Sequence, residues 1–376
     1  MAEPSGHLRN EQGIAPAREL KEKLYAMGTT VDIRCEADRI DVIVRGVDRN
    51  VIHSVAAMKA WLGWPAFEEG TRRALLSDVL ARRNSQRQDF ATISRALHAY
   101  ARHDEASDYR QVPSRAALRA SDVSYLRGLL IELIHTRHTT FYVGPRSVET
   151  LIPGVALGEG RFKEAPPPVQ SYRPDRRIWF AHSESAKAEI RITVPGPRLS
   201  EAERAYGELY RYYLRALGFA ELRVRRGLAY RVWAWSEPGE RSGQQSALGF
   251  LTAAQGDKVV DIVRGAVELL TRTEIDPDLF SRAKSAAAAM YSNTRTARKY
   301  RPHAMWNLGL RGLSSDPWGE QAAAIQDYGQ NEMTQLSRRI AAAAADNLLI
   351  TIVGDRERID LAALEAVAPV EEVAVE

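Results

Sequence analysis

The sequence has almost no cysteine and no long apolar run. Its single cysteine, Cys35, cannot form an internal disulfide or a site of several thiolates, so the fold depends on core packing. From Met1 to Ala15 the chain is polar and charged, without the apolar stretch of a secretory signal, and no later run is long enough to span a membrane. As written, the sequence predicts a cytoplasmic protein with no membrane partner; a fragment of an exported precursor would be periplasmic.

The sequence also lacks a large excess of positive or negative residues. The 52 basic residues are balanced by 48 acidic ones, and the two kinds are interspersed along the 376 residues. Because nucleic-acid binding proteins carry a basic stripe or tail, this distribution predicts no nucleic-acid partner. With 45% hydrophobic and 27% charged residues, the chain has the composition of a globular protein, and its length predicts two to three domains.

Motifs for metal, nucleotide and nucleophile chemistry are absent. The chain contains no H-x-x-E-H, no phosphate-binding loop and no G-x-S-x-G. His98 and His103 are five residues apart, which separates them by about 140° around a helix, so they do not converge on one ion. His135 and His138 share a helix face, but a strand is expected directly after them. We interpret both pairs as structural or surface histidines and assign no metal ligand.

Proline and a long-range repeat divide the chain into two halves. Pro166, Pro167 and Pro168 fix an extended backbone without amide donors, which indicates a linker. A β-branched run ends at Gly144, and a similar run ends at Gly354, an offset of 354 − 144 = 210 residues. The helices that open near Val51 and Val259 are 259 − 51 = 208 residues apart. Such similar spacings favour duplication of one folding unit.

Hydrophobic periodicity predicts strands followed by helices in each half. The first half is expected to contain a helix at 18–27, a hairpin at 30–35 and 39–45, helices near 49–62, 69–85, 88–101 and 122–136, and a closing strand at 139–143. The second is expected to contain strands at 176–181 and 189–194, a helix from the capping box of Ser200 and Glu203 to Leu217, strands near 228–236 and 245–253, helices near 257–272, 278–297, 317–327 and 331–345, and a closing strand at 348–353.

These elements predict an α+β fold of two homologous half-domains, each a mostly antiparallel sheet with helices packed on it. The first half has one helix before its hairpin, whereas the second has two strands and a long helix there, so the first is expected to be truncated at its N-terminus. The predicted boundaries are residues 1–164 for the truncated half-domain, 165–172 for the proline linker and 173–376 for the complete half-domain.

The strongest candidate site joins the end of a helix to the start of a strand. Arg223 lies on the helix, Gly227 follows it, and Tyr230 begins an aromatic strand. A guanidinium and a phenol projected toward one point can donate hydrogen bonds to a peptide carbonyl and stabilise the charge that develops when water attacks it. By composition alone, the pair is equally compatible with a surface arginine beside a half-buried tyrosine.

This segment resembles the substrate-binding motif of the insulinase/pitrilysin metallopeptidases, in which an arginine and a tyrosine are separated by six residues. The residues here are Arg223, Gly227, Leu228 and Tyr230. A helix start after Ile275-Asp276-Pro277 and a strand that ends in Val353-Gly354-Asp355 also resemble the family. The resemblance covers residues 170–376 well and 16–164 more loosely, and it is closest to the C-terminal half of long bacterial members. The H-x-x-E-H of the family is missing.

The resemblance implies a non-catalytic, substrate-binding half of a zinc metallopeptidase. Arg223 and Tyr230 would position a peptide for a zinc site on another polypeptide or on a missing segment. The implied partners are a zinc-bearing peptidase subunit or half and a peptide substrate. No cofactor is expected in this chain, which is predicted to be inactive alone. The alternative is an inactive peptide-binding or scaffold protein of the same fold, which could add a peptide strand to a sheet edge.

Overall fold

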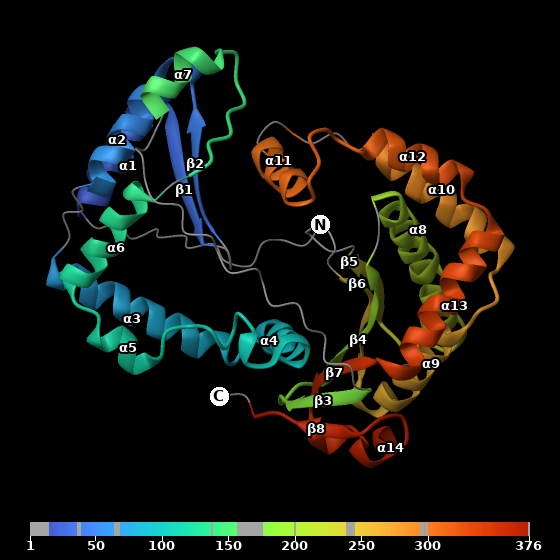
Figure 1. Ribbon diagram of the computed structural model, residues 1–376. Helices are drawn as coiled ribbons and strands as arrows, with labels where there is room; N and C mark the ends of the chain where they lie inside the picture. The colour runs from blue at the N-terminus through green and yellow to red at the C-terminus, as the bar shows by residue number, and fades with distance from the viewer. Residues whose placement is uncertain are drawn as a thin grey trace. The chain divides into compact units, whose positions relative to one another are not determined.

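The computed structural model describes residues 15–35, 39–63, 68–136, 138–155, 176–198, 201–237, 245–293, 297 and 300–374. These residues form two compact units (Figure 1). The first contains the described residues up to 84 and those from 112 to 155, and the second contains residues 85–111 with the described residues from 176 onward. Across all these segments, no helix has both the length and the apolar character that a membrane crossing requires.

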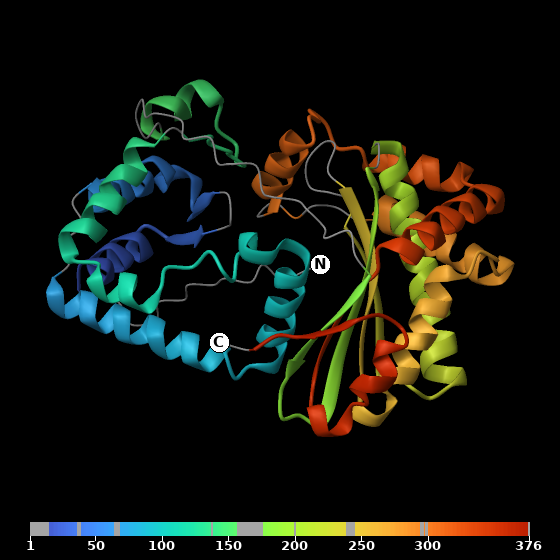
Figure 2. The same cartoon turned by 60° about the horizontal axis from the view of Figure 1, so that its bottom comes forward.

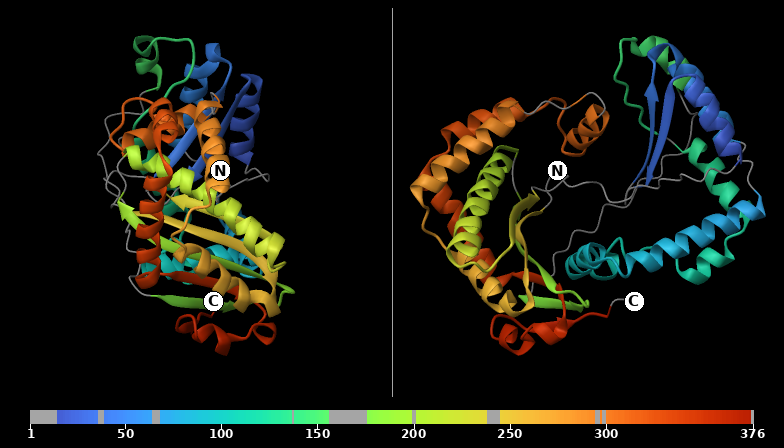
Figure 3. Two further views of the ribbon diagram at one scale, coloured as in Figure 1. Left: turned by 90° about the vertical axis from the view of Figure 1, so that its right-hand side faces the viewer. Right: turned by 180° about the vertical axis from the view of Figure 1, so that it is seen from behind.

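The first unit is built on a two-stranded hairpin with helices beside it (Figure 3). Its elements are α1 (Ala15–Ala26), β1 (Thr29–Cys35), β2 (Ile40–Gly46), α2 (Val51–Gly63), most of α3 (Glu69–Gln86), α5 (Arg115–Ala120), α6 (Val123–His135) and α7 (Val148–Val155). The strands pair antiparallel from Thr29 opposite Gly46 to Cys35 opposite Ile40. The alternating β-branched residues of the hairpin therefore produce the predicted pairing.

Helix α2 provides the core of the first unit. Val55, Met58 and Leu62 are buried and pack against valines of the hairpin and leucines of α6. The hydroxyls of Thr29 and Ser54 lie 2.8 Å apart in a buried hydrogen bond that links β1 to α2. The predicted order of hairpin and then helix is confirmed here.

The predicted closing strand at 139–143 is wrong, because these residues form no strand. The segment is held by side chains instead of a backbone ladder. Tyr142 donates its phenolic proton to Asp48, and Arg146 donates from Nε to the same carboxylate at 2.8 Å. The β-branched composition predicted a strand, but the contacts of Tyr142 and Arg146 with Asp48 hold the segment as a loop. The proline linker and Ser200 of the predicted capping box lie outside the described residues.

A six-stranded mixed sheet forms the centre of the second unit, in the order β5-β6-β4-β7-β3-β8. Its strands are β3 (Arg177–His182), β4 (Lys187–Arg198), β5 (Arg231–Glu237), β6 (Gln245–Gln255), β7 (Leu349–Gly354) and β8 (Val370–Glu372). The pairs from β5 to β7 are antiparallel, and β3 runs parallel to both β7 and β8. Every residue of β7 is buried, which explains its unbroken apolar sequence.

Helices cover one face of this sheet. They are α8 (Glu201–Gly218), which continues as the π-helix η3 (Phe219–Arg225), α9 (Val259–Thr271), α10 (Pro277–Asn293), α12 (Trp318–Asp327), α13 (Gln330–Asp346) and α14 (Leu361–Glu365). The unit also contains α11 (Arg301–Leu310), which has no buried residue and is not part of this layer. In β4, Ile190, Ile192 and Val194 are fully buried in the core beneath the helical layer. The residues between them point to the opposite face, as the period of two requires.

Helix α4 (Phe90–His103) covers part of the opposite face of the sheet (Figure 2). Its buried residues Ile93, Leu97 and Ala101 recur every three or four positions and form a second core with strand residues of β3 and β7, namely Trp179, Ala181, Leu349 and Val353. The part of the sheet formed by β3 and β7 therefore lies between the helical layer and α4. This helix precedes the predicted linker in sequence but packs in the second unit.

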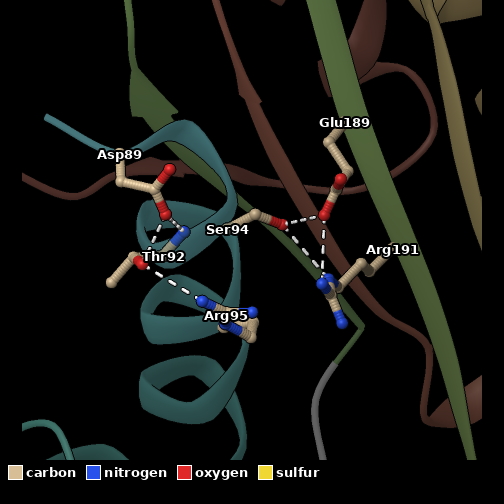
Figure 4. Close-up of polar contacts among 6 residues, drawn as sticks. All are labelled: Asp89, Thr92, Ser94, Arg95, Glu189 and Arg191. Atoms are coloured by element: carbon tan, nitrogen blue, oxygen red, sulfur yellow. Dashed lines mark hydrogen bonds and ion pairs between the residues drawn. The ribbon is translucent and has the colours of Figure 1, made fainter. Parts of the chain in front are cut away.

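A polar cluster fixes α4 to β4 (Figure 4). The buried hydroxyl of Ser94 donates to Oε1 of Glu189 at 2.5 Å and accepts from Nε of Arg191 at 3.1 Å. Arg191 and Glu189 also form an ion pair at 3.0 Å. At the start of the helix, the Asp89 carboxylate accepts from the backbone amide of Thr92 at 2.8 Å, which caps α4. The contacts of Ser94 therefore fix the position of α4 on the sheet, and Asp89 fixes where the helix begins.

Buried histidines make the α4 interface sensitive to acid. His98 is 8% exposed, its ring meets that of Trp235 edge-on at 5.9 Å, and its Nδ1 has no hydrogen-bond partner. Burial, with a smaller contribution from Arg102 and Arg191, holds the pKa of His98 well below its ordinary value of 6.5. Burial likewise lowers the pKa of His103. Folding therefore favours the neutral rings.

We expect the second unit to lose stability as the pH falls below about 6.5, because the unfolded chain then binds protons that the folded chain excludes. His98 contributes about 1.4 kcal/mol per pH unit until its lowered folded pKa is reached. Urea unfolding at pH 7.5, 6.5 and 5.5 measures this slope. The His98→Gln variant should show a shallower decline between pH 6.5 and 5.5, and a decline equal to that of the parent protein would contradict the role of His98.

Candidate functional site

The candidate site begins where α8 widens into the π-helix η3. The amide of Arg226 donates to the carbonyl of Glu221 at 3.1 Å, an interval of five residues. Leu222 is fully buried and anchors this turn in the core, whereas Arg223, Val224 and Arg225 are exposed. Gly265 of α9 leaves room for the turn, since a Cβ there would lie 2.8 Å from Cδ2 of Leu222. The π-helical turn therefore keeps Leu222 in the core and places Arg223 at the surface.

A tight loop carries the chain from η3 to β5. Gly227 has φ +60°, and the amides of Leu228 and Ala229 both donate to the carbonyl of Leu222, at 2.9 and 3.3 Å. The amide of Tyr230 then donates to the carbonyl of Ala253 in β6 at 3.0 Å. The loop therefore fixes Tyr230 against the sheet immediately before β5 begins.

Replacing Gly227 by alanine is expected to lower the free energy of unfolding by about 1–2 kcal/mol, because an L-residue pays that much to adopt a left-handed backbone. No atom lies within 4 Å of the position of a Cβ at Gly227, so the loss comes from the backbone alone. Urea unfolding measures it. Asparagine, which tolerates this conformation better, should cost less than alanine, and equal stability of all three proteins would contradict the account.

The structure brings the two predicted site residues together. The Cζ atom of Arg223 lies 5.9 Å from the centroid of the Tyr230 ring and 5.2 Å from that of Phe219. Tyr230 is 74% exposed, and Arg223 is also exposed. The guanidinium is thus held by cation–π contacts at the surface. Both side chains belong to one exposed surface at the C-terminal end of the helix.

The neighbouring arginines are neutralised, whereas Arg223 is not. Arg225 pairs with Glu221 at 3.2 Å, and Arg226 pairs with Glu268 at 2.9 Å. Within the described residues, no carboxylate pairs with Arg223. Its N–H groups and the hydroxyl of Tyr230 are therefore available as donors to a carbonyl or carboxylate oxygen.

Sequence reasoning missed one residue of this surface. Nζ of Lys187 lies 5.5 Å from the centroid of the Tyr230 ring. Lys187 opens β4, opposite Gln255 of β6, and the same strand β6 accepts the amide of Tyr230. Only the strand register joins these residues, which are far apart in sequence, so no local motif could have identified Lys187.

The residues that the structure describes do not fit a zinc ion. Among them, no three histidine, cysteine, aspartate or glutamate side chains gather as a metal site would need. His98 and His103 are part of the packing of α4, and His135 is exposed at the end of α6. Within the ranges that the structure describes, no donor set for a metal can be assigned.

No protein-family model and no curated protein matches the chain by sequence. Comparison of structures finds several similar proteins. The peptidase M16 inactive domain from Pseudomonas fluorescens aligns with a TM-score of 0.69 at 13% identity, over 92% of this chain and 86% of that one. The ferredoxin protease FusC, solved as a mutant in complex with Arabidopsis ferredoxin, aligns with a TM-score of 0.69 at 13% identity. The periplasmic protease PqqL from Escherichia coli aligns with a TM-score of 0.68 at 10% identity.

The two proteases are much longer than this chain. The alignments cover 90% of the chain in both cases, but only 38% of FusC and 39% of PqqL. The chain therefore aligns with most of the inactive domain but with less than half of each protease. This confirms the predicted α+β fold. The chain has the fold of the M16 peptidase inactive domains, as the resemblance to the insulinase/pitrilysin peptidases predicted.

Proposed function

We propose that this chain is the substrate-binding, non-catalytic half of a zinc metallopeptidase. Arg223 and Tyr230 would position a peptide for a zinc site that another polypeptide or a separate segment provides. The observation that carries the proposal is the proximity of these two side chains, whose guanidinium and ring lie 5.9 Å apart at the surface. The similarity of the fold to an M16 peptidase inactive domain and to part of the ferredoxin protease FusC supports it.

The chemistry assigned to this chain is hydrogen-bond donation. A peptide carbonyl that lies between Arg223 and Tyr230 accepts from an N–H of the guanidinium and from the phenolic O–H. When water adds to the carbonyl carbon, its oxygen becomes more negative and both bonds strengthen, which lowers the barrier. Zinc on the partner would polarise the same carbonyl and activate the water. Binding and orientation of the peptide are the contribution of the chain described here.

The proposed partner is a polypeptide or segment that carries H-x-x-E-H, and the proposed substrate is an unfolded or extended peptide. The compartment is part of the same proposal. The pair would work in the cytoplasm if the zinc-bearing half is not exported and in the periplasm if it is, where the similar PqqL protease is found. Fractionation of cells that express a tagged chain distinguishes the two.

Reconstitution tests the proposal. The purified chain, the H-x-x-E-H protein of the same genome and their mixture are incubated with an unfolded, fluorogenic protein substrate. The mixture should cleave it faster than either protein alone, and a chelator should abolish the cleavage. Chelator-sensitive cleavage by this chain alone would overturn the proposal. Peptide binding without any effect on a zinc-bearing partner would favour a peptide-binding scaffold instead.

A further inference from the structure

The face of the sheet opposite the helical layer carries exposed cations of β4 and β5. In β4, Ala188, Ile190 and Ile192 are buried in the core beneath the helical layer, so Lys187 points to the other face. In the register of the sheet, Glu189 lies opposite Ala253, and Ala253 lies opposite Arg231 of β5. Arg231 therefore points to the same face as Lys187.

Both cations are exposed, and Lys187 lies close to the candidate site. Lys187 approaches the Tyr230 ring to 5.5 Å, and Arg223 approaches the same ring to 5.9 Å. Arg231 follows Tyr230 directly in the chain. Two positive groups, Lys187 and Arg223, thus lie beside one exposed phenol, and Arg231 begins the strand that follows it. Repulsion between the positive groups favours the binding of an anion.

The acidic residues of the three strands and of η3 are already paired. β4, β5, β6 and η3 contain three carboxylates in total, Glu189, Glu237 and Glu221. Glu189 pairs with Arg191 at 3.0 Å, Glu237 pairs with Arg102 at 2.6 Å, and Glu221 pairs with Arg225 at 3.2 Å. Within the described part of the chain, no ion pair involves Lys187, Arg223 or Arg231. The local positive charge is therefore not cancelled by the strands that carry it.

We infer that this surface selects acidic peptides, with Lys187 and Arg231 as specificity-determining residues that bind an Asp or Glu side chain next to the residue held by Arg223 and Tyr230. This inference rests on the proposed function. The occupant is an extended peptide, because the exposed phenol and guanidinium offer donors to a backbone carbonyl while the two cations remain for a side-chain carboxylate. An acidic side chain is favoured over a neutral one by charge complementarity.

Fluorescence anisotropy with three labelled peptides tests the inference. The peptides share one unstructured sequence and differ at a central residue that is Glu, Gln or Lys. The full chain should bind the Glu peptide about fivefold more tightly than the Gln peptide, the effect of one or two exposed ion pairs, and the Lys peptide more weakly than either. The advantage of Glu over Gln should shrink as the salt concentration rises.

Charge-removing variants locate the effect. Lys187→Gln and Arg231→Gln should each reduce the advantage of the Glu peptide to about twofold or less, on the same scale for exposed pairs. Arg282→Gln removes an exposed positive charge from α10, which packs on α8 and α12, and should leave the advantage unchanged.

The outcomes separate the inference from the proposed function. Peptide binding that needs Arg223 but is equal for Glu and Gln would overturn the inference and leave the proposed function in place. Loss of the Glu advantage in Arg282→Gln to the same degree as in Lys187→Gln would also overturn it. Absence of binding for all three peptides would overturn both.

Discussion

The Arg223→Ala variant, assayed with a zinc-bearing partner half, is expected to cleave peptide about 10²–10³ times more slowly than the parent pair. That is the usual loss when one donor to a developing oxyanion is removed. Tyr230→Phe removes only the phenolic hydroxyl and should cause a loss of similar order. Both side chains are exposed and outside the core, so neither change should lower the stability of the fold.

The control for this experiment lies two residues away. Arg225 is on the same π-helix, its side chain is 74% exposed, and it pairs with Glu221. Arg225→Ala removes the same charge without removing the proposed donor, so turnover should change by less than about tenfold, as expected for an exposed ion pair. Equal losses in the Arg223 and Arg225 variants would show that general charge matters and that Arg223 has no special role. The turnover number and KM are measured separately for each pair.

The Gly249→Ala variant is expected to destabilise the second unit by about 1–3 kcal/mol, the usual cost of overpacking a filled interior. A Cβ at Gly249 in β6 would lie 2.1 Å from the carbonyl oxygen of Ile192 and 2.9 Å from the indole of Trp235. The carbonyl belongs to the backbone of β4 and cannot rotate away. The indole also contacts His98 of α4 edge-on at 5.9 Å, so its displacement should loosen that helix.

Urea unfolding followed by tryptophan fluorescence measures this loss. A matched control is Gly309→Ala on α11 of the same unit, where no atom lies within 4 Å of the added Cβ. Alanine is the better helix former, so this control should be neutral or stabilising by up to about 1 kcal/mol. If Gly249→Ala were as stable as the parent protein, the close packing of the β4 backbone and the Trp235 indole against Gly249 would be contradicted.

The helices and strands that follow from a local hydrophobic pattern could be predicted from the sequence. The apolar run that becomes β7 is buried along its whole length, and the hairpin β1–β2 alternates as predicted. The helices α2, α3, α4, α8, α9 and α13 begin and end within a few residues of their predicted bounds. The hydrophobic pattern is sufficient to predict these elements, although the similar solved structures named above are only 10–13% identical to the chain.

The rest depends on contacts that periodicity does not contain. Thr139–Val143 has the composition of a strand, yet Tyr142 and Arg146 bind Asp48 and hold the segment as a loop. The parallel pairing of β3 with β7 and β8 joins residues that are far apart in sequence, as does the contact of Lys187 with Tyr230. The approach of Arg223 to Tyr230 was predicted from the motif, whereas the π-helix that turns Arg223 outward was not.

Photo-crosslinking at Tyr230 tests the central claim most directly. A photoreactive phenylalanine derivative is introduced in place of Tyr230, and in a second protein in place of Arg282 on α10. Each is irradiated with a labelled extended peptide in the presence of the zinc-bearing partner. The account predicts a crosslinked peptide from position 230, reduced by the Arg223→Ala change, and none from position 282. Equal crosslinking from both positions, or none from position 230 while the unsubstituted pair cleaves the peptide, would contradict it.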